Sequence, residues 1–73
     1  MKEIVESEIA GTVWKIVARP GAELEEDDPI LILESMKMEI PVLMPEDGRV
    51  ENLLVAEGDT VREGQPLAEI SVS

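Results

Sequence analysis

Short runs of Val, Ile and Leu alternate along the whole chain with Gly, Pro and acidic residues. Gly or Pro recurs at positions 11, 20, 21, 29, 41, 45, 48, 58, 64 and 66, which leaves little room for a helix of ordinary length. Aliphatic runs bounded by such breakers are typical of β-strands. The pattern therefore predicts an all-β fold.

The chain also repeats itself at an offset of 37 residues without a gap. "GTVWKIVARPGAELEEDDPILIL" (11–33) aligns with "GRVENLLVAEGDTVREGQPLAEI" (48–70), and apolar positions coincide along both segments. The identical pairs are Val5/Val42, Gly11/Gly48, Val13/Val50, Gly21/Gly58, Glu26/Glu63 and Pro29/Pro66. We expect one domain over residues 1–73, with half-repeats at about 1–36 and 38–73 and the Lys37 hairpin between them.

Turn chemistry supports the same division. Gly in "RPG" (19–21), "EGD" (57–59) and "REGQP" (62–66) can adopt positive φ at little steric cost. In "EEDDP" (25–29) Asp27 occupies the position of Gly64, so we expect a left-handed Asp there. The apolar pairs Ile16–Val17 and Leu53–Leu54 break simple alternation, which indicates a bulge or strands covered on both faces.

The segment "ILILESMKMEI" (30–40) has no breaker for 11 residues and contains good helix formers. Its counterpart in the second half, "LAEI" (67–70), has the pattern of a strand, and equivalent segments should fold alike. We therefore expect strands over Ile30–Glu34 and Met38–Val42, with Ser35, Met36 and Lys37 as the tight turn. In a two-fold sandwich this turn lies at the opposite end from the chain termini, so Lys37 should be an exposed tip.

Composition narrows the possible functions. The net charge is −11, from 17 acidic and 6 basic residues, which argues against binding nucleic acid or anionic membranes. No apolar run approaches the roughly 20 residues of a membrane span. The absence of Cys and His rules out disulfides and nearly excludes an N/S metal site, and the absence of Cys fits a reducing compartment. We expect a soluble, cytoplasmic protein.

Lys37 is one of three lysines, and it stands between two of the four methionines. A catalytic lysine needs burial or nearby cations, whereas Glu34 and Glu39 flank this one. The serines have no His to activate them, and "ELEEDD" (23–28) lacks the spacing of an EF-hand calcium loop. Two hypotheses remain: a solubilising charge on a hairpin, or an accessible amine that another enzyme acylates.

A family resemblance favours the second hypothesis. "ESMKM" (34–38) resembles the "E-A-M-K-M" hairpin of biotinyl domains, and "EGDTVREGQPL" (57–67) resembles the "E-G-D-x-V-x-x-G-Q-P-L" of their second half. The resemblance covers residues 8–71, although Ser35 stands where Ala is usual and Ala22 where Asp is usual. It implies a flattened β-barrel, or sandwich, of two four-stranded antiparallel sheets with an internal quasi-two-fold repeat.

The same resemblance implies a biotin carboxyl carrier. Lys37 would be amide-linked to biotin, and the carrier would shuttle a carboxyl group between a biotin carboxylase and a carboxyltransferase without catalytic residues of its own. The segment recognised by biotin protein ligase would comprise Glu34, Ser35, Met36, Met38 and Glu39. The alternatives are a lipoyl carrier for 2-oxoacid dehydrogenase or glycine-cleavage chemistry, whose hairpins more often contain Asp-Lys-Ala, and a β-domain that carries no cofactor.

Overall fold

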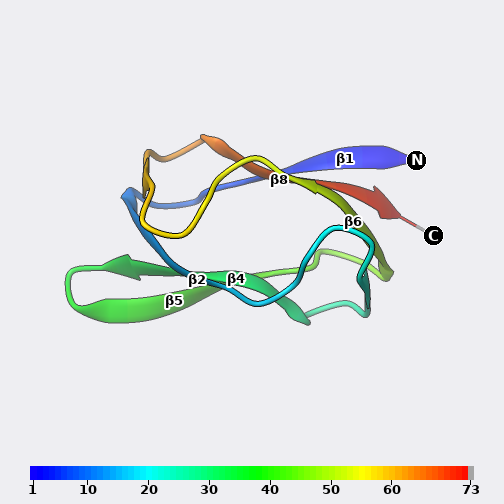
Figure 1. The fold of residues 1–73 in the computed structure, drawn as a ribbon, viewed down its shortest axis with the longest axis horizontal. Helices are drawn as coiled ribbons and strands as arrows, with labels where there is room; N and C mark the ends of the chain where they lie inside the picture. Colours follow the sequence, from blue (N-terminus) through cyan, green and yellow to red (C-terminus); the bar gives the residue numbers. More distant parts are fainter. Residues whose placement is uncertain (73) are drawn as a thin grey trace.

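The computed structural model describes residues 1–72 and contains eight β-strands, with no helix in that range. The strands form two four-stranded antiparallel sheets, in the orders β1-β8-β6-β3 and β5-β4-β2-β7, which face each other across the core (Figure 1). Their bounds are β1 Lys2–Glu6, β2 Gly11–Ile16, β3 Glu23–Leu24, β4 Pro29–Ser35, β5 Met38–Leu43, β6 Gly48–Leu53, β7 Thr60–Val61 and β8 Pro66–Val72. The expected all-β class with two four-stranded sheets is confirmed.

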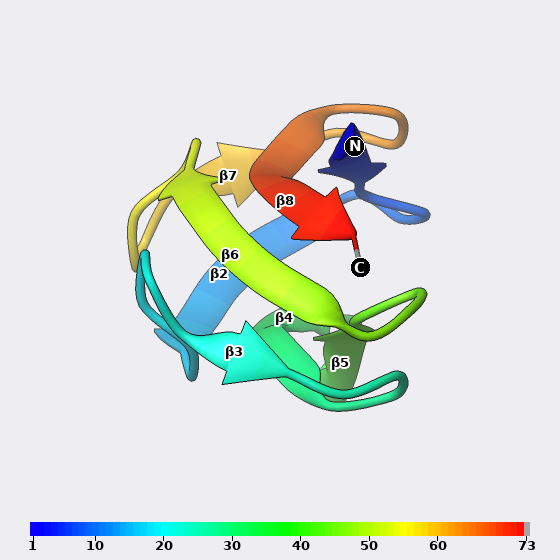
Figure 2. The same ribbon diagram turned by 90° about the vertical axis from the view of Figure 1, so that its right-hand side faces the viewer.

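The 37-residue offset relates one sheet to the other. Replacing β1, β8, β6 and β3 by the strands 37 residues away gives β5, β4, β2 and β7, which is the strand order of the second sheet. Connecting hydrogen bonds follow the same rule: Gly21 N donates to Val50 O at 2.7 Å, and Gly58 N donates to Val13 O at 2.8 Å. Seen from the end that carries both termini, the two sheets wrap around one central core (Figure 2).

Aliphatic side chains from both halves fill this core in equivalent positions. Burying a Val, Leu or Ile side chain stabilises a fold by about 1.5–3 kcal/mol, so these residues hold the sheets together. The buried equivalent pairs are Val13/Val50, Ile30/Leu67, Leu31/Ala68 and Leu33/Ile70. One pair differs in chemistry, because buried Met44 corresponds to buried Ser7, whose Oγ donates to Ile9 O at 2.6 Å.

The turns that connect the strands have the expected backbone conformations. Gly21, Gly58 and Gly64 have φ values of 95°, 93° and 84°. Asp27 has φ of 71°, as its equivalence to Gly64 predicted. Residues other than glycine seldom adopt positive φ. The repeat therefore identified a strained backbone position that the sequence around Asp27 did not reveal by itself.

The expected bulges are present, but at other residues. The register shifts between Val13 and Lys15 in β2 and between Val50 and Asn52 in β6, at positions 37 residues apart. The pairs Ile16–Val17 and Leu53–Leu54 instead mark the ends of these strands, and Val17 and Leu54 are exposed. Placing the bulge at these pairs, or covering them on both faces, was therefore wrong, because a strand end breaks alternation in the same way.

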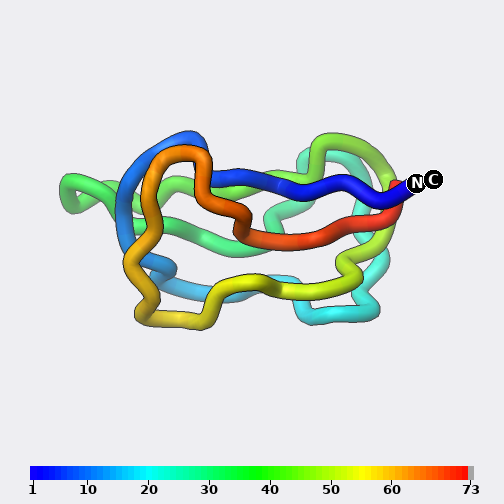
Figure 3. The backbone as a smooth tube through the Cα atoms, turned by 90° about the horizontal axis from the view of Figure 1, so that it is seen from above, coloured from blue at the N-terminus to red at the C-terminus, as the bar shows by residue number. Residues whose placement is uncertain are grey.

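The molecule is elongated, measuring 34 × 17 × 17 Å along its principal axes. The two chain ends lie together at one end, where Val72 N donates to Met1 O at 2.8 Å, and the β4–β5 hairpin projects at the other (Figures 1 and 3). This confirms the expected position of the Lys37 turn. A search of residues 1–72 finds no helix that is long and apolar enough to cross a membrane.

Candidate functional site

The projecting hairpin is built from a continuous register that ends in a two-residue turn. Leu33 pairs with Ile40, Glu34 with Glu39, and Ser35 with Met38, which leaves only Met36 and Lys37 between the strands. Ser35 is thus the last residue of β4, and the expectation that it belongs to the turn is wrong, because it pairs with Met38. The strands also extend slightly beyond the expected bounds, to Pro29 and Leu43.

Both turn residues adopt the left-handed conformation, with φ of 52° at Met36 and 64° at Lys37. Positive φ at both positions is the signature of a type I′ turn, whose twist matches that of the flanking strands. Such turns prefer Asn-Gly, and a residue with a Cβ loses about 1–2 kcal/mol in this region. Neither Gly nor Asn marked the turn, so the sequence analysis missed this strain. The register of the paired strands was the signal that could have revealed it.

The tip extends beyond the body of its sheet. Glu34 is the last hairpin residue with strand partners on both sides, Thr12 of β2 and Glu39 of β5. Gly11, at the start of β2, lies against this point: a Cβ there would be 2.6 Å from Glu34 O and 3.3 Å from Ser35 Cβ. The repeat identified Gly11, but its packing against the hairpin could not be read from the sequence.

The side chains of the tip face solvent. Met36 is 91% exposed and Met38 62% exposed, whereas Met44 in the core is fully buried. Lys37 is also exposed. The two methionines therefore contribute little to folding, and their flexible thioethers are available to a partner's surface.

Glu34 and Glu39 surround this apolar tip with negative charge. Both are exposed, and they lie directly opposite each other in the register. Like charges opposite each other destabilise a sheet slightly, so this pair does not stabilise the hairpin. Within residues 1–72 the one salt bridge joins Arg49 Nε to Glu51 Oε2 at 3.1 Å, which leaves the Lys37 amine outside any ion pair.

Lys37 is one of three exposed lysines whose amine could hold a group covalently, and it is the one at the projecting tip. The sequence contains no His or Cys, and residues 1–72 contain no group of three Asp or Glu placed to hold a metal ion. The acidic segment 23–28 is largely exposed, and Asp28 Oδ2 accepts a hydrogen bond from Glu25 N at 2.9 Å within it. The geometry therefore places the Lys37 amine where another protein could reach and acylate it.

Comparison with known proteins agrees with this geometry. The family model described as "Biotin-requiring enzyme" (Biotin_lipoyl) matches residues 1–70. The "Biotin/lipoyl attachment protein" of Bacillus subtilis (strain 168) is 42% identical over 69 residues, which cover 94% of each chain. The "Biotinylated protein TB7.3 homolog" of Mycobacterium leprae is 41% identical over 71 residues, covering 97% of this chain and all of the relative.

Solved structures give the same fold. The urea carboxylase of Kluyveromyces lactis contains a region that superposes with a TM-score of 0.92 at 37% identity, covering 97% of this chain but 6% of the carboxylase. The lipoyl domain of the 2-oxoglutarate dehydrogenase complex from Azotobacter vinelandii superposes with a TM-score of 0.73 at 32% identity, covering 85% of this chain and 78% of that domain. Biotinyl-type and lipoyl-type relatives thus share this architecture.

Proposed function

The chain belongs to the family of biotin-requiring enzymes that contains biotinyl and lipoyl domains, and we propose that it is a biotin carboxyl carrier with biotin on Lys37. The observation that carries the proposal is the hairpin tip: an exposed lysine in a strained two-residue turn between two exposed methionines. Residues held in disfavoured backbone conformations cluster at functional sites. Here Met36 and Lys37 occupy a type of turn that Asn-Gly would make more stable.

Attachment requires only the amine and access to it. As the free amine, Lys37 Nζ attacks the activated carboxyl group of biotin, an amide C–N bond forms, and the activating group leaves while nitrogen releases a proton. A projecting tip allows the ligase to surround the lysine on several sides without unfolding any strand. Glu34, Ser35, Met36, Met38 and Glu39 form the proposed recognition segment, in which the methionines supply apolar contact and the glutamates supply charge.

The body of the domain holds the attachment point and adds no chemistry. When bound, biotin supplies a ureido nitrogen that carries a carboxyl group between a biotin carboxylase and a carboxyltransferase. The aliphatic core and the paired strands keep the hairpin fixed, while the lysine side chain provides the flexible arm. Tethering of this kind acts through effective concentration, because the carried group meets each active site intramolecularly.

We further propose that residues 1–73 act as one carrier domain without catalytic residues of their own. An acidic chain without Cys suits a reducing compartment, so the cytoplasm is the proposed location. The acidic surface also favours partners with basic docking faces.

Intact-mass spectrometry of the protein isolated from its native cells tests the proposal, with fragmentation to locate the modified residue. We expect one added biotinyl group, on Lys37. A lipoyl group on Lys37 would replace biotin by lipoate as the carried cofactor. An unmodified chain under conditions in which other biotin proteins are fully labelled would contradict a carrier role.

A further inference from the structure

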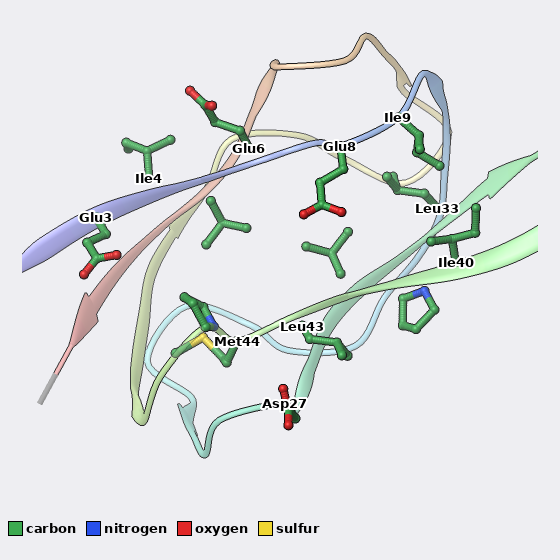
Figure 4. Close-up of a pocket in the computed structure, with 14 residues that line it drawn as sticks. Glu3, Ile4, Glu6, Glu8, Ile9, Asp27, Leu33, Ile40, Leu43 and Met44 are labelled. Atoms are coloured by element: carbon green, nitrogen blue, oxygen red, sulfur yellow. The ribbon is translucent and has the colours of Figure 1, made fainter.

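A groove of about 500 Å³ runs between β1 and β5, the edge strands of the two sheets (Figure 4). Its floor is apolar and includes Val5, Leu33, Val42 and Met44. Since the 37-residue offset exchanges β1 with β5, the groove lies where the two halves of the repeat face each other. The candidate attachment site is not part of it, because neither Met36, Lys37 nor Met38 lines the groove.

The β1 wall has an unused strand edge. Among the described strands, β1 pairs only with β8, and β5 pairs only with β4. In an edge strand, alternate residues direct their N–H and C=O groups away from the sheet, where they can pair with another strand. Pro41 interrupts this edge in β5, because Pro has no N–H. β1 (Lys2–Glu6) contains no Pro, so no outward N–H group is missing from its edge.

The two walls differ in charge although the repeat makes them equivalent in position. Glu3 and Glu8 point from the β1 side toward β5, and their counterparts 37 residues later are Ile40 and Pro45 on the opposite wall (Figure 4). None of the described residues that line the groove is basic. Asp27, whose N donates to Met44 O at 2.9 Å, adds a carboxylate on the β5 side, so the groove is apolar with acidic residues on both sides. Such a groove is complementary to a segment that carries both basic and apolar side chains.

The order of residues along β1 specifies that segment further. Glu3, Ile4, Val5 and Glu6 follow one another in β1, and in Figure 4 Glu3 points to the groove while Ile4 and Glu6 point to the outer face. The alternating burial of the strand places Val5 on the same face as Glu3. Cross-strand neighbours on the same face of a sheet interact most strongly, and opposite charges or apolar pairs are favourable. The best partner strand therefore reads basic–apolar–apolar–basic, and this order is the same in either strand direction.

We propose that the groove binds an extended segment of a partner protein with the pattern basic–apolar–apolar–basic, added as a strand to the free edge of β1. Its basic residues lie opposite Glu3 and Glu6, and its apolar residues lie opposite Ile4 and Val5. A second copy of this chain fits the same edge poorly. Two copies would each bring a net charge of −11 to this edge, and β1 offers only one basic residue, Lys2, to offset the repulsion.

NMR titration of the unmodified ¹⁵N-labelled protein tests this inference with a capped peptide whose core is arginine–valine–valine–arginine. We expect shift changes that gather on β1 and β5, as in strand addition. Glu3→Gln with Glu6→Gln should weaken binding at least about tenfold, because two charge-assisted cross-strand contacts are lost. Glu23→Gln with Glu63→Gln removes the same charge from exposed sites away from the groove and should leave most of the affinity.

Four results would overturn the inference. The first is the absence of localised shifts at millimolar peptide. The second is equal weakening by the control variant, and the third is equal binding of an arginine–serine–serine–arginine peptide, since both would indicate nonspecific attraction to an acidic protein. The last is dimerisation in the absence of peptide, seen by sedimentation as the protein concentration rises and accompanied by chemical-shift changes on β1. That result would assign the groove to a second copy of this chain. Because the unmodified protein is used, failure here would leave the carrier proposal unaffected.

Discussion

Gly11 lies so close to the backbone of Glu34 that a Cβ on Gly11 would be 2.6 Å from the Glu34 carbonyl oxygen. Gly48 repeats the arrangement in the other sheet, where a Cβ would overlap the Ser71 carbonyl oxygen. In the β5-β4-β2-β7 sheet, the contact of Gly11 with Glu34 occurs at the last hairpin residue that has strand partners on both sides. Gly11 therefore sets the position from which the Lys37 tip projects.

Replacing Gly11 by Ala should destabilise the protein by about 1–3 kcal/mol, the usual cost of overpacking a tight contact. The change should also move the amide resonances of Glu34 and Ser35, because their backbone must shift to admit the Cβ. Gly21→Ala is the matched control: its Cβ would meet no atom within 4 Å, and its cost comes from φ of 95° alone. Denaturant midpoints and amide shifts measure both effects, and unchanged hairpin resonances in Gly11→Ala would contradict the contact.

Lys37→Arg should abolish biotinylation and leave the fold intact, because the Lys37 side chain is exposed and makes no ion pair in the described structure. Arg keeps the charge but has no amine that forms this amide. Streptavidin blotting after co-expression with a biotin protein ligase measures modification, and far-UV circular dichroism measures folding. Lys15→Arg is the control. Biotin retained on the Lys37 variant would move the attachment site to Lys2 or Lys15.

Met36→Asn should stabilise the protein by up to about 1 kcal/mol, because Asn tolerates the left-handed region better than Met does. The gain depends on φ of 52° at position 36. Met38→Asn provides the comparison, since position 38 lies in β5, where Asn is disfavoured. Thermal or denaturant unfolding separates the two variants. If both change stability equally, the turn does not store the strain inferred from its backbone.

The double variant Met36→Asp/Met38→Ala should lower the rate of biotinylation at least about tenfold, which corresponds to about 1.4 kcal/mol of lost ligase contact. Both side chains are exposed, so the fold should persist. Val17→Asp with Leu54→Ala makes the same change of charge at two half-exposed apolar residues away from the hairpin. Initial rates of biotinylation by a biotin ligase measure the effect in both double variants. Modification at the parental rate would remove the methionines as a reason to prefer biotin over lipoate.

Acid titration should reveal the Arg49–Glu51 pair. The hydrogen bond from Arg49 lowers the pKa of Glu51 from its ordinary value of 4.5, with smaller contributions from the charge of Arg49 and from Ser71. A carboxyl group with a lowered pKa stabilises the fold above its ordinary pKa, and that stabilisation is lost as pH falls through the folded-state value. Arg49→Gln should raise the pKa of Glu51, as measured by NMR titration of its side-chain carboxyl carbon. An unchanged pKa would show that the pair does not form in solution.

The repeat made most of the fold predictable, because each half tests the interpretation of the other. Gly64 identified the left-handed Asp27, and the second-half strand resolved the helix-forming segment before Lys37. Prediction from the local apolar pattern failed where two different backbone structures produce the same pattern. An apolar pair does not distinguish a bulge at Trp14 from a strand that ends at Ile16.

The tip was located from sequence but not fully described. The turn lacks the Gly or Asn that normally signals positive φ, so the strain at Met36 and Lys37 became visible only from the strand register. The contact of Gly11 with Glu34 joins residues far apart in the chain, and no local pattern encodes such an approach. The groove was hidden for the same reason, since its walls come from β1 and β5.

The position of both chain ends opposite Lys37 also determines how far the amine can travel. When the domain is held by a linker at either end, its rigid 34 Å length adds to the distance from the linker that the lysine can reach. The span of a flexible linker grows only with the square root of its length, at about 5–6 Å × √n. A disordered chain would need roughly 30–45 residues to span the same distance, and it would lose far more conformational entropy when its end docks into an active site.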